Sequence, residues 1–181
     1  VQIVGGEAAA RATCQQLPPN FPGYKPYCPY TLNPGPEGEG SWSGPDMEEA
    51  QRLVRRSGTA GSRVVVKLPA FFFRLSDAQV RLLGDYMIEL LDDLGYVGSW
   101  ERVANFEVFY GPDLEFNMVV DAWIGDYPAA SNFITNRFTC DASFNPSAGF
   151  CEPRIDAMID RATQTQIDDP ALRLVQPHLE C

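Results

Sequence analysis

The chain has 181 residues, of which 45% are hydrophobic and 21% charged, so it is long and apolar enough to bury one sizeable core with a smaller satellite. It contains 14 lysine and arginine residues against 24 aspartate and glutamate residues, which gives a formal net charge of -10. A charge of this sign repels phosphate backbones and anionic membrane surfaces, so nucleic acid is not an expected partner. No apolar run approaches the about 20 residues that a membrane-spanning helix needs.

The cysteines fall into two close pairs and one leftover: Cys14 with Cys28, Cys140 with Cys151, and the last residue, Cys181. Each pair brackets an irregular segment rich in proline, glycine and asparagine, which a disulfide would stabilise by about 3 kcal/mol in the chain-entropy model. A zinc site is the alternative, but the only histidine is His178. We expect two disulfides, an oxidising compartment, an unpaired Cys181, and neither a metal nor a cofactor.

Residues 1–45 hold much of the proline and glycine, in segments such as LPPNFPGYKPYCPY and NPGPEGEG, and are expected to form an extended loop. The α/β core is expected over 46–175, and 1–181 is interpreted as a single domain. A helix is predicted from Pro45 to Gly58, with acidic residues in its first turn and arginines in its last.

The run RVVVKLPAFFF that follows predicts a buried strand, typical of a sheet covered by helices. Ser76 and Gln79 form a capping box, and apolar residues then recur at helical spacing as far as Gly95. A short strand is expected from Trp100 to Val103. This order predicts an open α/β layer fold whose sheet is at least partly parallel.

After the short segment FEVFY, the stretch EFNMVVDAW predicts another strand, with WIGDYP at its carboxyl end. In open α/β sheets ligands tend to bind at the carboxyl ends of strands, so this is where a site is expected. PRIDAMIDRA predicts the last clear helix, with Pro153 at its start.

No pattern in the sequence indicates catalysis, because no histidine is placed to act as a base. The carboxylate pairs Asp92 with Asp93 and Asp168 with Asp169 are interpreted as solvated surface rather than acid and base. A carboxylate between two aromatic residues is different, because Trp123, Asp126 and Tyr127 could hold a cation such as an amino group. The alternative is that Trp123 is core, Asp126 caps the helix after Pro128, and Tyr127 packs.

Several segments in order resemble one known family: TCQQLPPNFPGYKPYCPYT, WSGPDMEEAQRLVRRSGTAGSRVVV, LLDDLGY, WIGDYPAASNFI and NxxxGFCEPRIDAMIDRA. The resemblance is to the extracellular solute-binding proteins of family 5, the receptors of peptide, dipeptide and nickel ABC importers. It extends from about Gln2 to about Arg173 and implies the carboxyl-side lobe of a type II periplasmic-binding-protein fold, an open mixed sheet covered by helices with a disulfide-stapled N-terminal loop.

The resemblance further implies that Asp126 anchors the amino terminus of a peptide ligand, that Trp123 forms an aromatic wall of the pocket, and that Tyr127 belongs to the same motif. The implied partners are a peptide or small solute, the N-terminal lobe of the same parent protein, and an ABC permease in the membrane. The parent is expected outside the cytoplasm with a lipid anchor. Two alternatives stay open: a non-peptide solute such as a nickel complex or a sugar, and an independent secreted enzyme or structural domain sharing only the fold.

Overall fold

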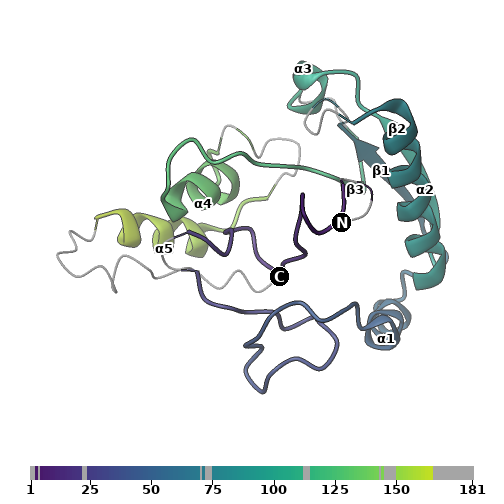
Figure 1. The fold of residues 1–181 in the computed structure, drawn as a ribbon, viewed down its shortest axis with the longest axis horizontal. Helices are drawn as coiled ribbons and strands as arrows, with labels where there is room; N and C mark the ends of the chain where they lie inside the picture. The colour runs from purple at the N-terminus through teal and green to yellow at the C-terminus, as the bar shows by residue number, and fades with distance from the viewer. Residues whose placement is uncertain are drawn as a thin grey trace.

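The computed structural model describes residues 3, 5–21, 24–69, 71, 75–111, 115–142, 144 and 150–164 (Figure 1). The predictions for Asp168, Asp169, His178 and Cys181 lie outside these residues. None of the helices within the described ranges is both long and apolar enough to cross a membrane.

The sheet has three strands in the order β2-β1-β3, and both pairings are parallel. The central strand β1 (Arg63–Leu68) pairs along its whole length with β2 (Val97–Arg102), whereas β3 (Met118–Val119) adds only a two-residue edge. The predicted α/β class is therefore confirmed, but the sheet within the described residues is parallel, not mixed as the resemblance implied. The strand expected near Trp100 begins earlier than predicted, and the one expected from EFNMVVDAW is much shorter.

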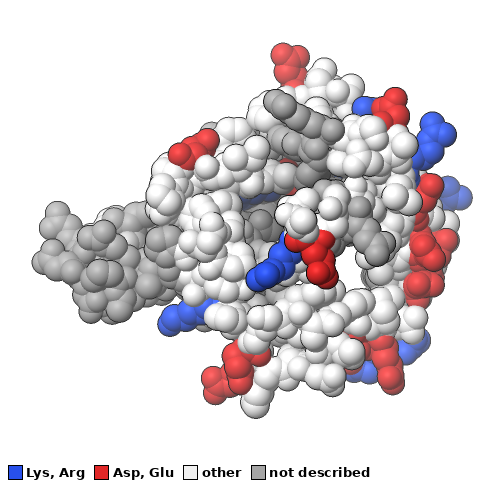
Figure 2. Space-filling model, in the orientation of Figure 1, with Lys and Arg blue, Asp and Glu red and all other residues white. Residues whose placement is uncertain are grey.

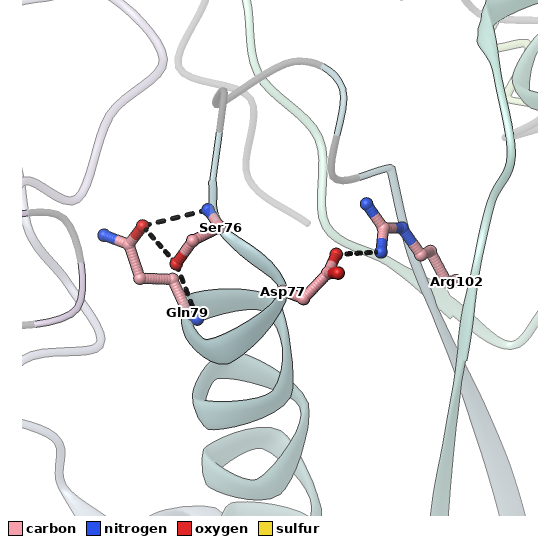
Figure 3. Close-up of polar contacts among 4 residues, drawn as sticks. All are labelled: Ser76, Asp77, Gln79 and Arg102. Carbon is pink, nitrogen blue, oxygen red and sulfur yellow. Dashed lines mark hydrogen bonds and ion pairs between the residues drawn. The ribbon is translucent and has the colours of Figure 1, made fainter.

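The long helix α2 (Asp77–Leu94) forms as predicted. Its capping box is complete, because the Ser76 hydroxyl accepts from the Gln79 backbone while the Gln79 side chain accepts from the Ser76 backbone (Figure 3). At the other end Gly95 has φ 95°, a left-handed conformation that glycine adopts without a steric penalty. Arg102 at the end of β2 donates to Asp77 over 2.5 Å and ties the start of the helix to the sheet.

The first hydrophobic cluster lies between α2 and the sheet. Its buried members are Val66, Leu68, Val80, Met87 and Leu91, contributed by β1 and by one face of α2. Trp100 of β2 packs against this cluster and lies on Gly84, where an added Cβ would come within 2.3 Å of the indole. We call α2 and the three strands the sheet region.

Two further helices flank this region. Helix α1 (Met47–Ser57) is capped by the Asp46 side chain and ends at Gly58, which confirms the predicted helix from Pro45 to Gly58 with its start moved by two residues. Helix α3 (Phe106–Phe109) is a single turn within the FEVFY segment, to which the sequence analysis assigned no structure.

After β3 the chain leaves the sheet and reaches α4 (Ala130–Phe138) and α5 (Pro153–Gln164) on the other side of the molecule (Figure 1). These helices pack against each other and contribute to a second cluster, whose buried members are Leu17, Phe133, Ile134 and Ile159. Leu17 comes from the N-terminal loop, so distant parts of the sequence share this core. We call α4, α5 and residues 14–28 the hairpin region.

Both predicted disulfides are present. Cys14 bonds Cys28 with their Cα atoms 5.2 Å apart, and Cys140 bonds Cys151 with a Cα separation of 4.4 Å. The second bridge joins the end of α4 to the residues just before α5, where the Asp156 carboxylate also accepts from the Cys140 backbone.

The described part of residues 1–45 contains no α-helix or multi-residue strand. Its order comes from isolated bridges, Tyr27 with Glu39 and Thr31 with Pro45, and from turns. Thr31 is buried, and its hydroxyl donates to the Gly44 carbonyl over 3.0 Å. Turns and side-chain hydrogen bonds thus order the described part of this segment in place of regular secondary structure.

Candidate functional site

The site candidates lie in the segment that joins β3 to α4, where the sequence analysis expected a site. Trp123 is half-buried, whereas Asp126 and Tyr127 are exposed, Tyr127 by 47%. The structure thus brings all three onto one short turn. Tyr127 makes one long contact, with its hydroxyl 3.4 Å from the hydroxyl of Ser131.

One fully buried side chain, Asn132 in the first turn of α4, organises this turn. Its Oδ1 atom accepts a hydrogen bond from the Trp123 indole Nε1 over 2.8 Å and a second from the Asp126 backbone N–H over 3.2 Å. Its Nδ2 atom donates to Asp126 Oδ2 over 3.3 Å. The Trp123 indole and the Asp126 carboxylate are therefore hydrogen-bonded to the same side-chain amide.

The turn rests on aromatic rings of the hairpin region. A Cβ built on Gly125 would lie 3.0 Å from the Phe133 ring and 3.3 Å from that of Phe21, so only glycine fits this approach without a shift of its neighbours. Phe21 itself meets Phe133 edge to face, with centroids 4.8 Å apart. Because Phe21 belongs to the loop closed by the first disulfide, the N-terminal loop packs against the turn that carries the site.

A charged pair lies beside the indole. Arg137 of α4 bonds Asp121 through Nη2, and its Cζ atom lies 5.5 Å from the centroid of the Trp123 ring. The two charged side chains are only 13% and 17% exposed, so their attraction is screened less than that of a surface pair. Burial raises the pKa of the nearby Tyr110 phenol, the Asp121 carboxylate raises it further, and Arg137 opposes the shift.

The Asp126 carboxylate differs from that of Asp121 in having no cationic partner among the described residues. One oxygen accepts the amide of Asn132, and no hydrogen bond from a described residue reaches the other. An exposed carboxylate and a half-buried indole that bond the same amide are groups able to give a cation a charge-assisted hydrogen bond and an apolar surface.

The alternative role of Asp126 as a helix cap is wrong. Helix α4 begins at Ala130, its N-cap is Ala129, and no side chain caps it. The alternative for Trp123 holds in part, since this residue packs against the second hydrophobic cluster while its indole N–H bonds Asn132.

Three carboxyl groups elsewhere in the described part of the chain have a shifted pKa. Those with a lowered pKa are exposed and each owes the shift to a nearby arginine: Glu49 beside Arg52, Asp77 beside Arg102, and Glu152, whose main partner is the Arg154 backbone N–H. Asp92 and Asp93 are exposed at the end of α2, as predicted. Figure 2 shows charged side chains along the edge of the molecule where α2 runs in Figure 1. The described residues include no cluster of three potential metal ligands.

Sequence reasoning missed two residues of this site, Asn132 and Arg137. The available signal for Asn132 is its place in α4 directly before Phe133 and Ile134, because a polar residue inside a buried helical stretch needs hydrogen-bond partners. The partners themselves, six and nine residues earlier in the sequence, have no periodic relation to it.

No protein-family model matches the sequence, and no curated protein matches it. Solved structures do. The clavulanic acid biosynthesis oligopeptide binding protein 2 matches with a TM-score of 0.69 at 21% sequence identity. The match covers 95% of this chain and 31% of that protein's chain. A putative peptide binding protein AppA from Clostridium difficile gives 0.69 at 14%, covering 95% and 32%. The periplasmic binding protein DppA from Helicobacter pylori, in complex with the peptide STSA, gives 0.68 at 15%, covering 93% and 31%.

These similarities confirm the fold that the resemblance to family 5 solute-binding proteins implied. The similar structures are those of peptide-binding proteins, not of enzymes. The chain spans about a third of their length. At these identities the likeness establishes the fold alone.

Proposed function

We propose that this chain is the carboxyl-side lobe of the solute-binding component of a peptide-type ABC importer, and that it is a binding protein and not an enzyme. The complete receptor captures peptides or similar small solutes outside the membrane and delivers them to a permease. The peptide-binding proteins with this fold support the proposal, as does the share of their length that the chain spans.

The observation that carries this proposal is the state of Asp126. Its carboxylate is exposed, has no cationic partner among the described residues, and bonds the same Asn132 amide as the Trp123 indole. An exposed anion of this kind costs little free energy while it faces water. It makes a strong contact once a ligand ammonium group is enclosed with it. Asp126 then anchors the amino group, Trp123 forms an apolar wall, and Tyr127 lies at the edge of the pocket.

The proposed mechanism is closure of two lobes. The turn from Trp123 to Tyr127 would provide one side of the pocket and the N-terminal lobe of the same parent protein the other. Contacts that the ligand makes only in the closed state would shift the open and closed populations. The two disulfides support a location outside the cytoplasm, and the family resemblance adds a lipid anchor to the parent.

The anchor role is tested with Asp126→Asn in the complete receptor that contains this chain. Binding of a pool of di- to tetrapeptides with free amino termini, measured by calorimetry, should weaken by at least about 30-fold, the scale expected on removing one partner of an enclosed charge pair. Binding of the same peptides after N-acetylation should be weak in both proteins. The matched control is Asp92→Asn on α2, which should leave affinity unchanged; an unchanged affinity in Asp126→Asn contradicts the anchor.

The lobe assignment is tested by comparing the isolated 181-residue chain with the complete receptor. A single lobe offers one side of the pocket, so binding of the same peptide pool should be detected only with the receptor. Tight binding by the isolated chain would place a whole site within these residues and would favour the independent-domain alternative. If the receptor rejects every peptide but binds a nickel complex or a sugar, the ligand class is wrong while the lobe assignment stands.

A further inference from the structure

The amide of Asn132 has a single orientation that satisfies its surroundings. Two N–H groups, the Trp123 indole and the Asp126 backbone, both point at one end of the amide, and only the oxygen end can accept from them. The nitrogen end then faces Asp126 Oδ2, which needs a donor. The three contacts fix one another, and Asn132 is fully buried at the centre of them.

This arrangement treats the two carboxylate oxygens differently. Oδ2 is occupied by the Asn132 amide, and Oδ1 accepts nothing from the described residues. The Trp123 ring is held by the oxygen of the same amide over 2.8 Å and lies under the Arg137 guanidinium. One side chain therefore determines both which oxygen is available and where the indole stands.

We propose that Asn132 is the positioning residue of the binding site: it fixes the Asp126 carboxylate and the Trp123 indole in the relative arrangement that a ligand ammonium group meets. This inference rests on the proposed function and deepens it. Asn132 does not touch the ligand; it acts through the two residues that do. Preorganising them in the free protein removes the cost of ordering them when the ligand binds.

Ligand affinity is the first test, with Asn132→Leu in the complete receptor. The leucine has the same branched shape but cannot make any of the three hydrogen bonds, so free-amine peptides should bind about tenfold more weakly. Asn132→Ala, which adds no bulk, should behave alike and serves if the leucine variant fails to fold. The matched control is Asn136→Leu, one turn later on α4. The Asn136 side chain makes no hydrogen bond to a described residue, so this variant should bind the peptides with unchanged affinity.

A positioning role is separated from a general structural one by two further measurements. First, because Asn132 acts partly through Asp126, combining Asp126→Asn with Asn132→Ala should weaken binding by less than the product of the two single-variant factors. Second, hydrogen exchange at the Trp123 indole N–H, read by NMR in ligand-free protein and assigned with Trp123→Phe, should speed up about tenfold or more in Asn132→Ala because the bond to Oδ1 is lost.

The outcomes distinguish the inference from the function it rests on. If Asp126→Asn weakens binding but the Asn132 variants do not, the positioning role is overturned and the anchor survives. Additive losses in the double variant, or indole exchange that is unchanged in Asn132→Ala, overturn it as well. If Asp126→Asn itself has no effect on affinity, the anchor fails, and any loss on changing Asn132 is structural.

Discussion

In the sheet region, α2 covers β1 and β2 through aliphatic side chains, and every element of the core lies between residues 63 and 102 apart from the two-residue strand β3. The hairpin region is assembled differently. Its helices are 9 and 12 residues long, its core includes Leu17 from the N-terminal loop, and two disulfides close it. A nearly contiguous segment can bury enough apolar surface to hold itself together, whereas short helices that contact a distant loop benefit from covalent bridges.

The candidate site belongs to the second kind of region. Trp123 and Asp126 lie on a turn whose support comes from α4 and from the stapled loop, through Asn132, Phe133 and Phe21. The candidate turn is therefore positioned by cross-links and polar contacts, whereas the sheet region is held together by contiguous apolar packing.

The largest effect should come from the disulfides. Replacing all four cysteines by serine removes two loop closures, each worth about 3 kcal/mol in the chain-entropy model. Amide hydrogen exchange in α4 and α5 should accelerate, while exchange in α2 should stay slow, because neither bridge touches the sheet region. Wild-type protein under oxidising conditions is the control. An equal loss of protection in α2 would show that the two regions unfold as one unit.

A smaller effect is expected from Gly84→Ala in the sheet region. The new methyl group would meet the Trp100 indole at 2.3 Å, and the resulting overpacking should cost about 2 kcal/mol of unfolding free energy despite the better helix propensity of alanine. Urea denaturation measures this loss. Leu82→Ala on the exposed side of α2 is the control and should change stability by less than about 0.5 kcal/mol. A neutral Gly84→Ala would mean that Trp100 moves freely, and the sheet region would then be less tightly packed than the comparison assumes.

The smallest effect concerns the exposed pair between Asp77 and Arg102. The hydrogen bond from Arg102 lowers the pKa of Asp77 below its ordinary value of 3.8, so the pair stabilises the folded state above that value, and this contribution is lost as the pH falls through the lowered pKa. Asp77→Asn should therefore reduce stability near neutral pH, and the difference from wild type should shrink as the pH falls below about 4. Urea denaturation at several pH values measures it. A difference that stays constant with pH would assign the loss to an effect other than the charge of Asp77, such as helix propensity; Asp85→Asn on the same helix is the control.

Much of the sheet region could be predicted because its signals are local. The capping box at Ser76, the glycine at Gly95 and the apolar spacing between them define α2 within a residue at each end. The strand from EFNMVVDAW was predicted too long, because only Met118 and Val119 find a partner in β1 and the remaining residues turn toward α4 instead. Strand length depends on the neighbour that supplies hydrogen bonds, which the sequence of one segment does not contain.

The α/β class, the pairing of the cysteines and the segment expected to carry a site follow from the sequence alone, because helix capping, loop composition and residue type act over short distances along the chain. The three-dimensional packing was needed to show that Asp126 caps no helix, that Asn132 links its carboxylate to Trp123, and that Arg137 pairs with Asp121 beside the indole. Those contacts join residues whose separation follows no helical or strand period. They depend on where packing places the ends of the chain segments, and a buried amide or guanidinium can be assigned a role only when its partners are known.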